Sequence, residues 1–242
     1  SKNSIEKFDL IVDLQSKLRN TLILNQIPSK YFYSSTLNFK FCSTHKDYIS
    51  TKFDNNKILH NLEKLLNDTI LYKKYDTDLI ADKYLKEAKR LLPDNNYIGF
   101  SITQGNIYRK KSWPIEKFLS VADKILKKNK KPVFFIEKNN SELINKIKKQ
   151  IPIALIPELD SNLSGPPLVT ALSKRLEKAI SIDNGIMHMI GLANIPMTVL
   201  FGPTNSKKFS PKIKNINILD SKILYNSEEI SKIKEEDVLN LI

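Results

Sequence analysis

The sequence has few cysteines for disulfide bonds and no long apolar runs for membrane insertion. Its 242 residues include one cysteine, Cys42, so no internal disulfide can form and we expect a reducing cytoplasm. No apolar run approaches the roughly 20 residues that a transmembrane helix needs, and we expect no signal peptide. Because the first residue is Ser1 rather than Met, we expect a fragment or a processed product.

Acidic residues are also scarce relative to basic ones. The chain has 39 Lys and Arg against 26 Asp and Glu, a net charge of +13 that suggests a nucleic acid, an acidic membrane face or a phosphorylated substrate as partner. The lysines are scattered, however, and are not interleaved with aromatics and arginines as in nucleic-acid-binding proteins. Biased composition therefore explains the charge better than a nucleic-acid site, and a peripheral contact with an anionic membrane stays open.

What the sequence does contain is a regular alternation of strand and helix patterns from residue 97 onward. Strand patterns occupy residues 97–103, 132–137, 153–156, 178–182, 197–201 and 215–219. Helix patterns occupy residues 113–129, 141–151, 166–176, 185–193 and 228–242. This α/β alternation predicts a Rossmann-type parallel sheet with helices on both faces, in which ligands bind beyond the carboxyl ends of the strands.

The first part of the chain is less regular. Residues 8–14 are typical of a buried strand and residues 16–27 of a helix, whereas residues 31–41 suggest an irregular or edge-strand region. Helical spacing returns at residues 58–75 and 78–92. The LPDNN turn at residues 92–96 is the best candidate for a domain boundary.

A first polar cluster, SITQGNIYRKKSWP at residues 101–114, leaves a strand and enters a helix. Its polar members are Thr103, Gln104, Gly105, Asn106, Arg109, Lys110 and Lys111. Hydroxyl, amide and backbone donors beside a cation are typical of an anion site, although neither a Gly-x-Gly-x-x-Gly nor a Walker spacing is present. A solvated basic loop with Trp113 as a core anchor is an equally good interpretation.

A second cluster follows the strand at residues 178–182. Asp183 ends the strand, Gly185 can take a backbone conformation that other residues avoid, and a helix begins at once. The unpaired N–H groups at the start of this helix would hold a diphosphate. His188 would lie one turn further on, and Asp183 would accept hydrogen bonds from ligand hydroxyls. Taken alone, the alternative is stronger: Asp183 and Asn184 cap the helix, and His188 packs in the core.

A third cluster, FGPT at residues 201–204, follows the next strand and adds Pro203 and the Thr204 hydroxyl. By itself it is equally typical of an ordinary turn. The three clusters follow three strands of one predicted sheet, so we expect them to converge on one rim.

Four short motifs carry a resemblance. Residues 183–188 read DNGIMH, residues 201–204 read FGPT, residues 111–114 read KSWP, and residues 13–15 read DLQ with Arg19 following. In this the chain resembles glycosyltransferase family 9, the lipopolysaccharide heptosyltransferases, whose motifs are Asp-Ser/Thr-Gly-Pro-Met-His, Phe-Gly-Pro-Thr, Lys-x-Trp-Pro and Asp-Leu-Gln. Each motif is weak singly, but the order is kept across nearly the whole chain.

The resemblance implies the GT-B fold, in which an acceptor domain faces a nucleotide-sugar domain. Residues 1–94 would form a partial acceptor-side domain, residues 95–225 the donor domain, and residues 226–242 a helix returning toward the acceptor side. Family members begin with further strand–helix units that hold the general base. The N-terminal domain is therefore expected to be incomplete here, with the base outside this chain.

The resemblance also implies roles for single residues. Lys111, His188 and Asp183 form the catalytic set: the first two bind the donor diphosphate and Asp183 holds the transferred sugar. Together with the three clusters, it gives a donor-binding set of Thr103, Gln104, Gly105, Asn106, Lys111, Glu142, Asp183, Asn184, Gly185, His188, Pro203 and Thr204. The acceptor-side set is Asp13, Gln15 and Arg19.

Some of these assignments have plainer alternatives, and two positions depart from the family. Glu142 is also a normal carboxylate for a helix start, Asp13 a carboxylate at a strand end, and Arg19 a surface residue. Asn184 replaces the family's Ser/Thr but keeps a backbone donor. Ile186 replaces its Pro and leaves one more N–H to satisfy.

The resulting hypothesis is a bacterial glycosyltransferase. It would move a heptose-like sugar from a nucleotide donor, which the resemblance implies is ADP-linked, to a lipopolysaccharide core or other lipid-linked glycan, with inversion. No metal and no cofactor are expected, because Lys111 and His188 would stabilise the leaving diphosphate in place of a divalent ion. Residues 76–78, Asp-Thr-Asp, are interpreted as a helix boundary rather than a metal site.

Three alternatives stay open. The first is a basic binding module for anionic lipid or nucleic acid that has no chemistry of its own. The second is a GT-B epimerase or phosphorylase that uses the same diphosphate crevice. The third is a chain that binds the donor but does not turn it over.

Overall fold

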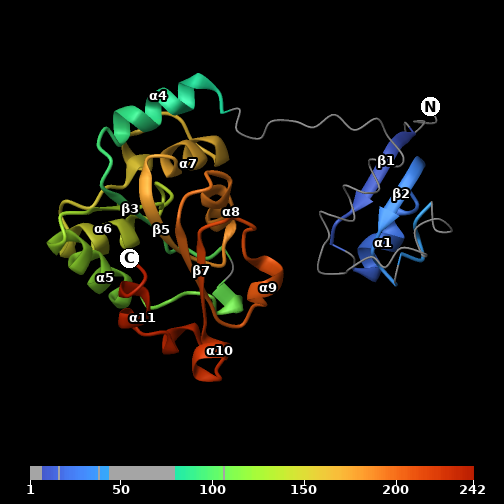
Figure 1. The fold of residues 1–242 in the computed structure, drawn as a ribbon. Helices are drawn as coiled ribbons and strands as arrows, with labels where there is room; N and C mark the ends of the chain where they lie inside the picture. The colour runs from blue at the N-terminus through green and yellow to red at the C-terminus, as the bar shows by residue number, and fades with distance from the viewer. Residues whose placement is uncertain (1–6, 16, 38, 44–79, 106) are drawn as a thin grey trace. The chain divides into compact units, whose positions relative to one another are not determined.

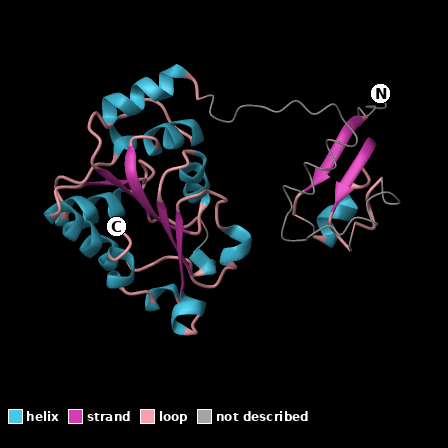
Figure 2. Cartoon of the chain, viewed as in Figure 1, coloured by secondary structure: helices cyan, strands magenta, loops and turns pink. Residues whose placement is uncertain are grey.

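The computed structural model describes residues 7–15, 17–37, 39–43, 80–105 and 107–242, drawn in colour in Figures 1 and 2. The chain divides into two units, Ser1–Tyr75 and Asp76–Ile242. The division lies earlier than the boundary predicted at residues 92–96, because helix α4 (Asp82–Leu91) packs against α7 (Pro166–Ser173) of the second unit. Ala88 and Leu92 are buried in that contact.

The described residues of the first unit form two parallel strands and one helix. Strands β1 (Phe8–Asp13) and β2 (Ser29–Ser34) pair with Leu10 opposite Tyr31, and α1 (Leu18–Leu24) connects them. The prediction of a buried first strand is wrong for its beginning, where Phe8 is exposed, because the small core of Tyr33, Phe39 and Cys42 reaches only its far end. The predicted helix at residues 58–75 and the Asp-Thr-Asp motif lie outside the described residues.

The second unit is built on a five-stranded parallel sheet. Its strands are β3 (Tyr97–Ser101), β4 (Lys131–Phe134), β5 (Leu176–Ile182), β6 (Met197–Phe201) and β7 (Ile216–Asp220), in the order β4-β3-β5-β6-β7. The predicted parallel sheet is confirmed, except that residues 153–156 contribute only an isolated bridge, Leu155 to Val133. The chain turns outward from β3 to β4 and then crosses back to β5, so the topological switch point lies between β3 and β5.

Helices cover both faces of this sheet (Figure 1). One face carries α5 (Ile115–Lys127), α6 (Ser141–Gln150) and α11 (Glu235–Leu239); the other carries α4, α7 and α8 (Gly185–Leu192). Alternate side chains of each strand enter the two cores: in β3, Tyr97 enters one, and Ile98 and Phe100 enter the other. The shorter elements are η1 (Ile107–Arg109), η2 (Pro157–Asp160), α9 (Ser206–Phe209), α10 (Ser221–Tyr225) and η3 (Ile230–Lys232).

The end of the chain differs from the continuous helix predicted at residues 228–242. It is broken into η3 and α11, because the Asp237 carboxylate accepts a hydrogen bond from the Lys234 N–H at 2.8 Å and starts a new helix. The Ile233 carbonyl just before the break accepts from Trp113 Nε1 at 3.0 Å and Lys117 Nζ at 2.8 Å. The segment therefore packs on α5 of its own unit, and its predicted approach to the acceptor side stays a prediction.

No helix in the part of the chain that the structure describes is long and apolar enough to cross a membrane.

Gly202, the glycine of the FGPT motif, has a packing reason to be glycine. A Cβ there would lie 2.8 Å from the Glu228 carbonyl oxygen and 2.8 Å from the Ile230 Cβ. We expect Gly202→Ala to lower the free energy of unfolding by about 1–3 kcal/mol, the usual cost of overpacking, in urea titrations followed by circular dichroism. The control is Gly105→Ala, whose Cβ would meet no atom within 4 Å. Equal stability of both variants would contradict the packing account.

Candidate functional site

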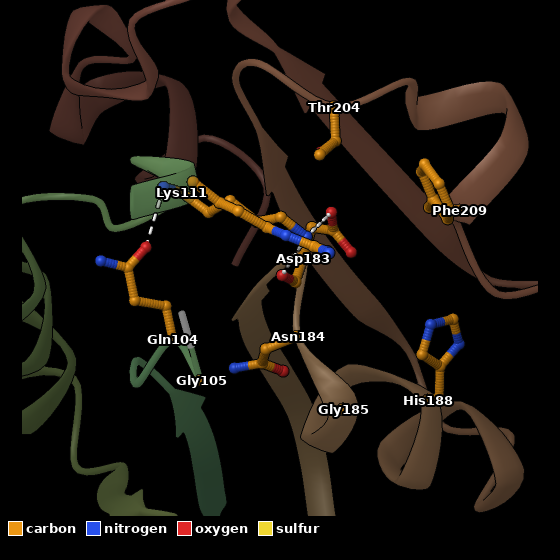
Figure 3. Close-up of a pocket in the computed structure, with 10 residues that line it drawn as sticks. Gln104, Gly105, Lys111, Asp183, Asn184, Gly185, His188, Thr204 and Phe209 are labelled. Atoms are coloured by element: carbon orange, nitrogen blue, oxygen red, sulfur yellow. Dashed lines mark hydrogen bonds and ion pairs between the residues drawn. The ribbon is translucent and has the colours of Figure 1, made fainter. Parts of the chain in front are cut away.

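A pocket of about 370 Å³ lies at the carboxyl ends of β3, β5 and β6, where the switch point predicts a ligand (Figure 3). Its lining residues are Gln104, Gly105, Arg109, Lys111, Asp183, Asn184, Gly185, His188, Thr204 and Phe209. They come from the loops after the three strands, from the first turn of α8 and from the end of α9. The fold thus brings the three predicted clusters together at one rim of the sheet. The volume of the pocket suits a small-molecule site.

Asn184 fixes the two sides of this pocket to each other. Its Oδ1 accepts a hydrogen bond from the Met187 N–H at 2.8 Å and caps α8. Its Nδ2 donates to the Thr103 carbonyl at 2.8 Å and to Ser101 Oγ at 2.8 Å, both at the end of β3. The family has Ser or Thr at this position, and a hydroxyl has one proton and a shorter reach than a carboxamide. A hydroxyl could therefore not make all of these hydrogen bonds alone.

Lys111 and Asp183 form the main charged contact of the pocket. Lys111 Nζ lies 2.5 Å from Asp183 Oδ2 and 3.3 Å from the Asp183 carbonyl oxygen, and the two side chains are only 13% and 8% exposed. The Lys111 N–H donates to Gln104 Oε1 at 2.9 Å, which orders the loop that carries the lysine (Figure 3). An ammonium group is therefore held beside the N-terminus of α8, with a donor left over for a ligand.

The interpretation of Gly185 as a residue with a special backbone conformation is wrong. Gly165 is the one glycine in the described part of the chain with a positive φ, and Gly185 begins α8 in an ordinary helical conformation. A Cβ on Gly185 would meet no atom within 4 Å. Its missing side chain instead leaves the first N–H groups of the eight-residue α8 open to the pocket, where the helix dipole favours an anion.

His188 is exposed and lines the pocket, so the alternative that places it in the core is wrong. The core positions of α8 are taken by Met187 and Ile190. In Figure 3, His188, Phe209 and Thr204 lie on the other side of Asp183 from Gln104. An imidazole there can donate a hydrogen bond to a ligand oxygen.

Two lining residues were not in the predicted donor-binding set. Arg109 belongs to the basic run RKK at residues 109–111, and only the three-dimensional structure separates Arg109 and Lys111, which line the pocket, from Lys110, which does not. Phe209 ends the four-residue helix α9, an element that the hydrophobic pattern did not predict. Its only signal was a bulky apolar residue in the otherwise polar run NSKKFSP at residues 205–211.

Other members of the predicted donor set do not line the pocket. Thr103 contributes its carbonyl to Asn184 rather than its side chain, and the Pro203 carbonyl accepts from Lys222 Nζ at 2.9 Å. Glu142 is exposed in the first turn of α6, beyond the end of β4. Asn106 lies outside the described residues. The ligand roles proposed for all four stay predictions.

The predicted acceptor-side residues lie in the first unit. Asp13 and Gln15 line a separate pocket of about 400 Å³, whereas Arg19 is exposed and does not line it. The buried Asp13 carboxylate accepts hydrogen bonds from Thr21 Oγ1 at 2.5 Å and Ser34 Oγ at 3.0 Å. These bonds fix α1 and β2 to the end of β1, which is a structural role for Asp13.

Comparison with known proteins gives one family and several solved structures. The model of the family described as glycosyltransferase family 9 (heptosyltransferase) matches residues 4–239. No curated protein matches the chain. A glycosyltransferase family 9 structure from Veillonella parvula DSM 2008 matches with a TM-score of 0.69 and 21% identity, over 98% of this chain and 73% of that one.

Two E. coli structures are similar as well. The heptosyltransferase WaaC with ADP-2-deoxy-2-fluoro heptose has a TM-score of 0.66 and 14% identity, over 97% of this chain and 71% of that one. The ADP-heptose lps heptosyltransferase II has a TM-score of 0.60 and 14% identity, over 96% and 73%. At such identities the likeness establishes a fold of the GT-B glycosyltransferase type, which confirms the predicted fold class.

The double role of Asn184 can be tested by stability. We expect Asn184→Ala to lower the free energy of unfolding by about 1–2 kcal/mol, because a helix cap is lost. Asn184→Ser is the matched control: it keeps an oxygen for the Met187 N–H and should lose less, although it gives up the bond to the Thr103 carbonyl. Urea titrations of both variants measure the difference. Two variants within about 0.5 kcal/mol of the wild type, as at ordinary surface positions, would contradict this role.

Proposed function

The chain belongs to glycosyltransferase family 9, and we propose that its pocket binds a nucleotide-diphosphate sugar and transfers the sugar to a lipid-linked glycan. The observation that carries the proposal is the convergence of Lys111, His188 and the open N-terminus of α8 on one pocket. All three attract anions. They come from two segments of the chain, since Lys111 lies 72 residues before Asp183, whereas His188 belongs to α8 itself.

The diphosphate would lie across the first turn of α8. The N–H groups at Gly185 and Ile186 supply fixed donors, because the Met187 N–H is already used by the Asn184 cap. Lys111 approaches from the β3 side and His188 from within the helix. Gly185 leaves the space that a phosphate oxygen needs to reach these donors.

The chemistry follows from where charge develops. The oxygen of an acceptor hydroxyl forms a bond to the anomeric carbon, the bond from that carbon to the diphosphate breaks, and its electron pair leaves with the nucleotide. The hydroxyl proton passes to a base on the acceptor side. Because the leaving diphosphate gains charge in the transition state, the donors aimed at it lower the barrier. Attack from the face opposite the leaving group inverts the anomeric carbon.

The donor and acceptor are narrower parts of the proposal. An ADP-linked heptose is supported by the similarity to solved heptosyltransferases whose names include ADP or ADP-heptose. A lipopolysaccharide core acceptor is supported by the family and by the name of the E. coli lps heptosyltransferase II. A net charge of +13 would favour a peripheral contact with an anionic membrane that carries such an acceptor.

Binding of ADP tests the donor site directly. At about 100 times its dissociation constant, ADP should stabilise the wild type by about 2.7 kcal/mol in a thermal-shift assay. Lys111→Ala should lose most of this stabilisation and His188→Ala part of it, each compared with its own ligand-free form. Lys110→Ala is the matched control, because Lys110 carries the same charge one residue away and does not line the pocket. No stabilisation of the wild type by ADP, UDP or GDP would contradict the proposal.

Metal independence is tested by turnover. With ADP-heptose, a heptose-deficient lipopolysaccharide acceptor and an acceptor domain that supplies the base, release of ADP should proceed at an unchanged rate in excess EDTA, because Lys111 and His188 neutralise the leaving group. The anomeric configuration of the product, read by NMR, should be opposite to that of the donor. Loss of turnover in EDTA with recovery on adding Mg²⁺ would show that these two residues do not replace a metal.

A further inference from the structure

The pocket has a second side that the diphosphate contacts do not use. Thr204 and Phe209 lie across Asp183 from Gln104 in Figure 3, beyond the end of β6. A nucleotide sugar held by its diphosphate at α8 extends in two directions, one toward β3 and β4 and the other toward β6 and α9. The end of the ligand that extends toward β6 and α9 would contact Thr204 and Phe209, which line the pocket there.

Thr204 is the polar group on this side. Its Oγ1 is buried and makes no hydrogen bond with any part of the chain that the structure describes, although it lines the pocket. Buried hydroxyls are almost always paired, so this unpaired hydroxyl at a pocket has a bond that a ligand can supply. A hydroxyl can both donate and accept, which suits the hydroxyl groups of a sugar.

Phe209 supplies an apolar surface beside that hydroxyl. Phe209 is 40% exposed and lines the pocket, so its ring is accessible to a ligand. The C–H groups on one face of a sugar ring pack well against an aromatic ring. A hydroxyl next to an aromatic face is thus the pairing of polar and apolar groups that a sugar ring presents.

The short helix that carries Phe209 is held in place. Asn205 caps it by accepting from the Lys208 N–H at 3.1 Å, and Ser206 Oγ donates to the buried Asp220 carboxylate at 2.6 Å. The second bond links α9 to the end of β7. Phe209 and Thr204 therefore sit on a fixed support, so their spacing can select a ligand shape.

We propose that Thr204 and Phe209 form the subsite for the transferred sugar and decide which sugar is accepted. This inference rests on the proposed function. It assigns the β6 side of the pocket to the sugar and the opposite side, toward β3 and β4, to the nucleoside. The alternative occupant of the same subsite is the nucleobase, which would also stack on Phe209.

Binding of ADP and of ADP-heptose, both measured by isothermal titration calorimetry, separates these occupants. Thr204→Val keeps the shape of the side chain and removes the hydroxyl, and Phe209→Ala removes the ring. Each should weaken ADP-heptose binding by about tenfold, the effect of one ordinary contact, and leave ADP binding unchanged within about twofold. Lys207→Ala, on the same helix but outside the pocket, should change neither.

The possible results are distinguishable. Equal weakening of ADP and ADP-heptose would overturn the assignment and place the nucleoside at Thr204 and Phe209. Unchanged binding of both ligands in both variants would also overturn it. If the wild type bound neither ligand, the proposed function itself would fail and this inference with it. Phe209→Ala at a half-exposed position tests the proposal even if Thr204→Val proves unstable.

Discussion

The geometry of the site depends on the side chain of one residue, Asn184. Its carboxamide reaches from the end of β5 to the end of β3 and at the same time caps α8. The connections that leave these two paired strands run in opposite directions at the switch point, and this link holds the two loops to each other. With it, Lys111 from one loop and Asp183 from the other come within 2.5 Å of each other. Asn184, which stands where the family has Ser or Thr, therefore bonds to both loops through one side chain.

The ion pair between Lys111 and Asp183 changes how a ligand enters. A diphosphate does not meet a bare ammonium, because Asp183 already occupies one of its three donors and neutralises part of its charge. The ligand must therefore share Lys111 with Asp183 or displace Asp183 from it. If Asp183 is displaced, its carboxylate becomes free to accept hydrogen bonds from ligand hydroxyls, which is the role predicted for it from the sequence.

The alternation of strands and helices was predictable because every buried strand of the second unit is a short apolar run between turn residues. The clusters were predictable for the same reason: each directly follows such a run, and parallel strands end at one edge. Local pattern did not reveal contacts between distant segments. The binding of the Ile233 carbonyl by Trp113, which accompanies the break in the last helix, is one example, and the position of Phe209 beside the pocket is another. The prediction for Gly185 failed for another reason. A glycine can be required for the space that its missing side chain leaves, and not only for an unusual backbone conformation.

Trp113 is the single tryptophan of the chain, and its environment gives it a use beyond packing. It is 2% exposed, stands edge-on to Phe118 with ring centroids 4.8 Å apart, and donates to the Ile233 carbonyl. It is also two residues from Lys111. The tryptophan fluorescence of this protein therefore originates at one residue, between the ligand-facing loop and the C-terminal segment. Detachment of that segment would be visible as a red shift without any added dye.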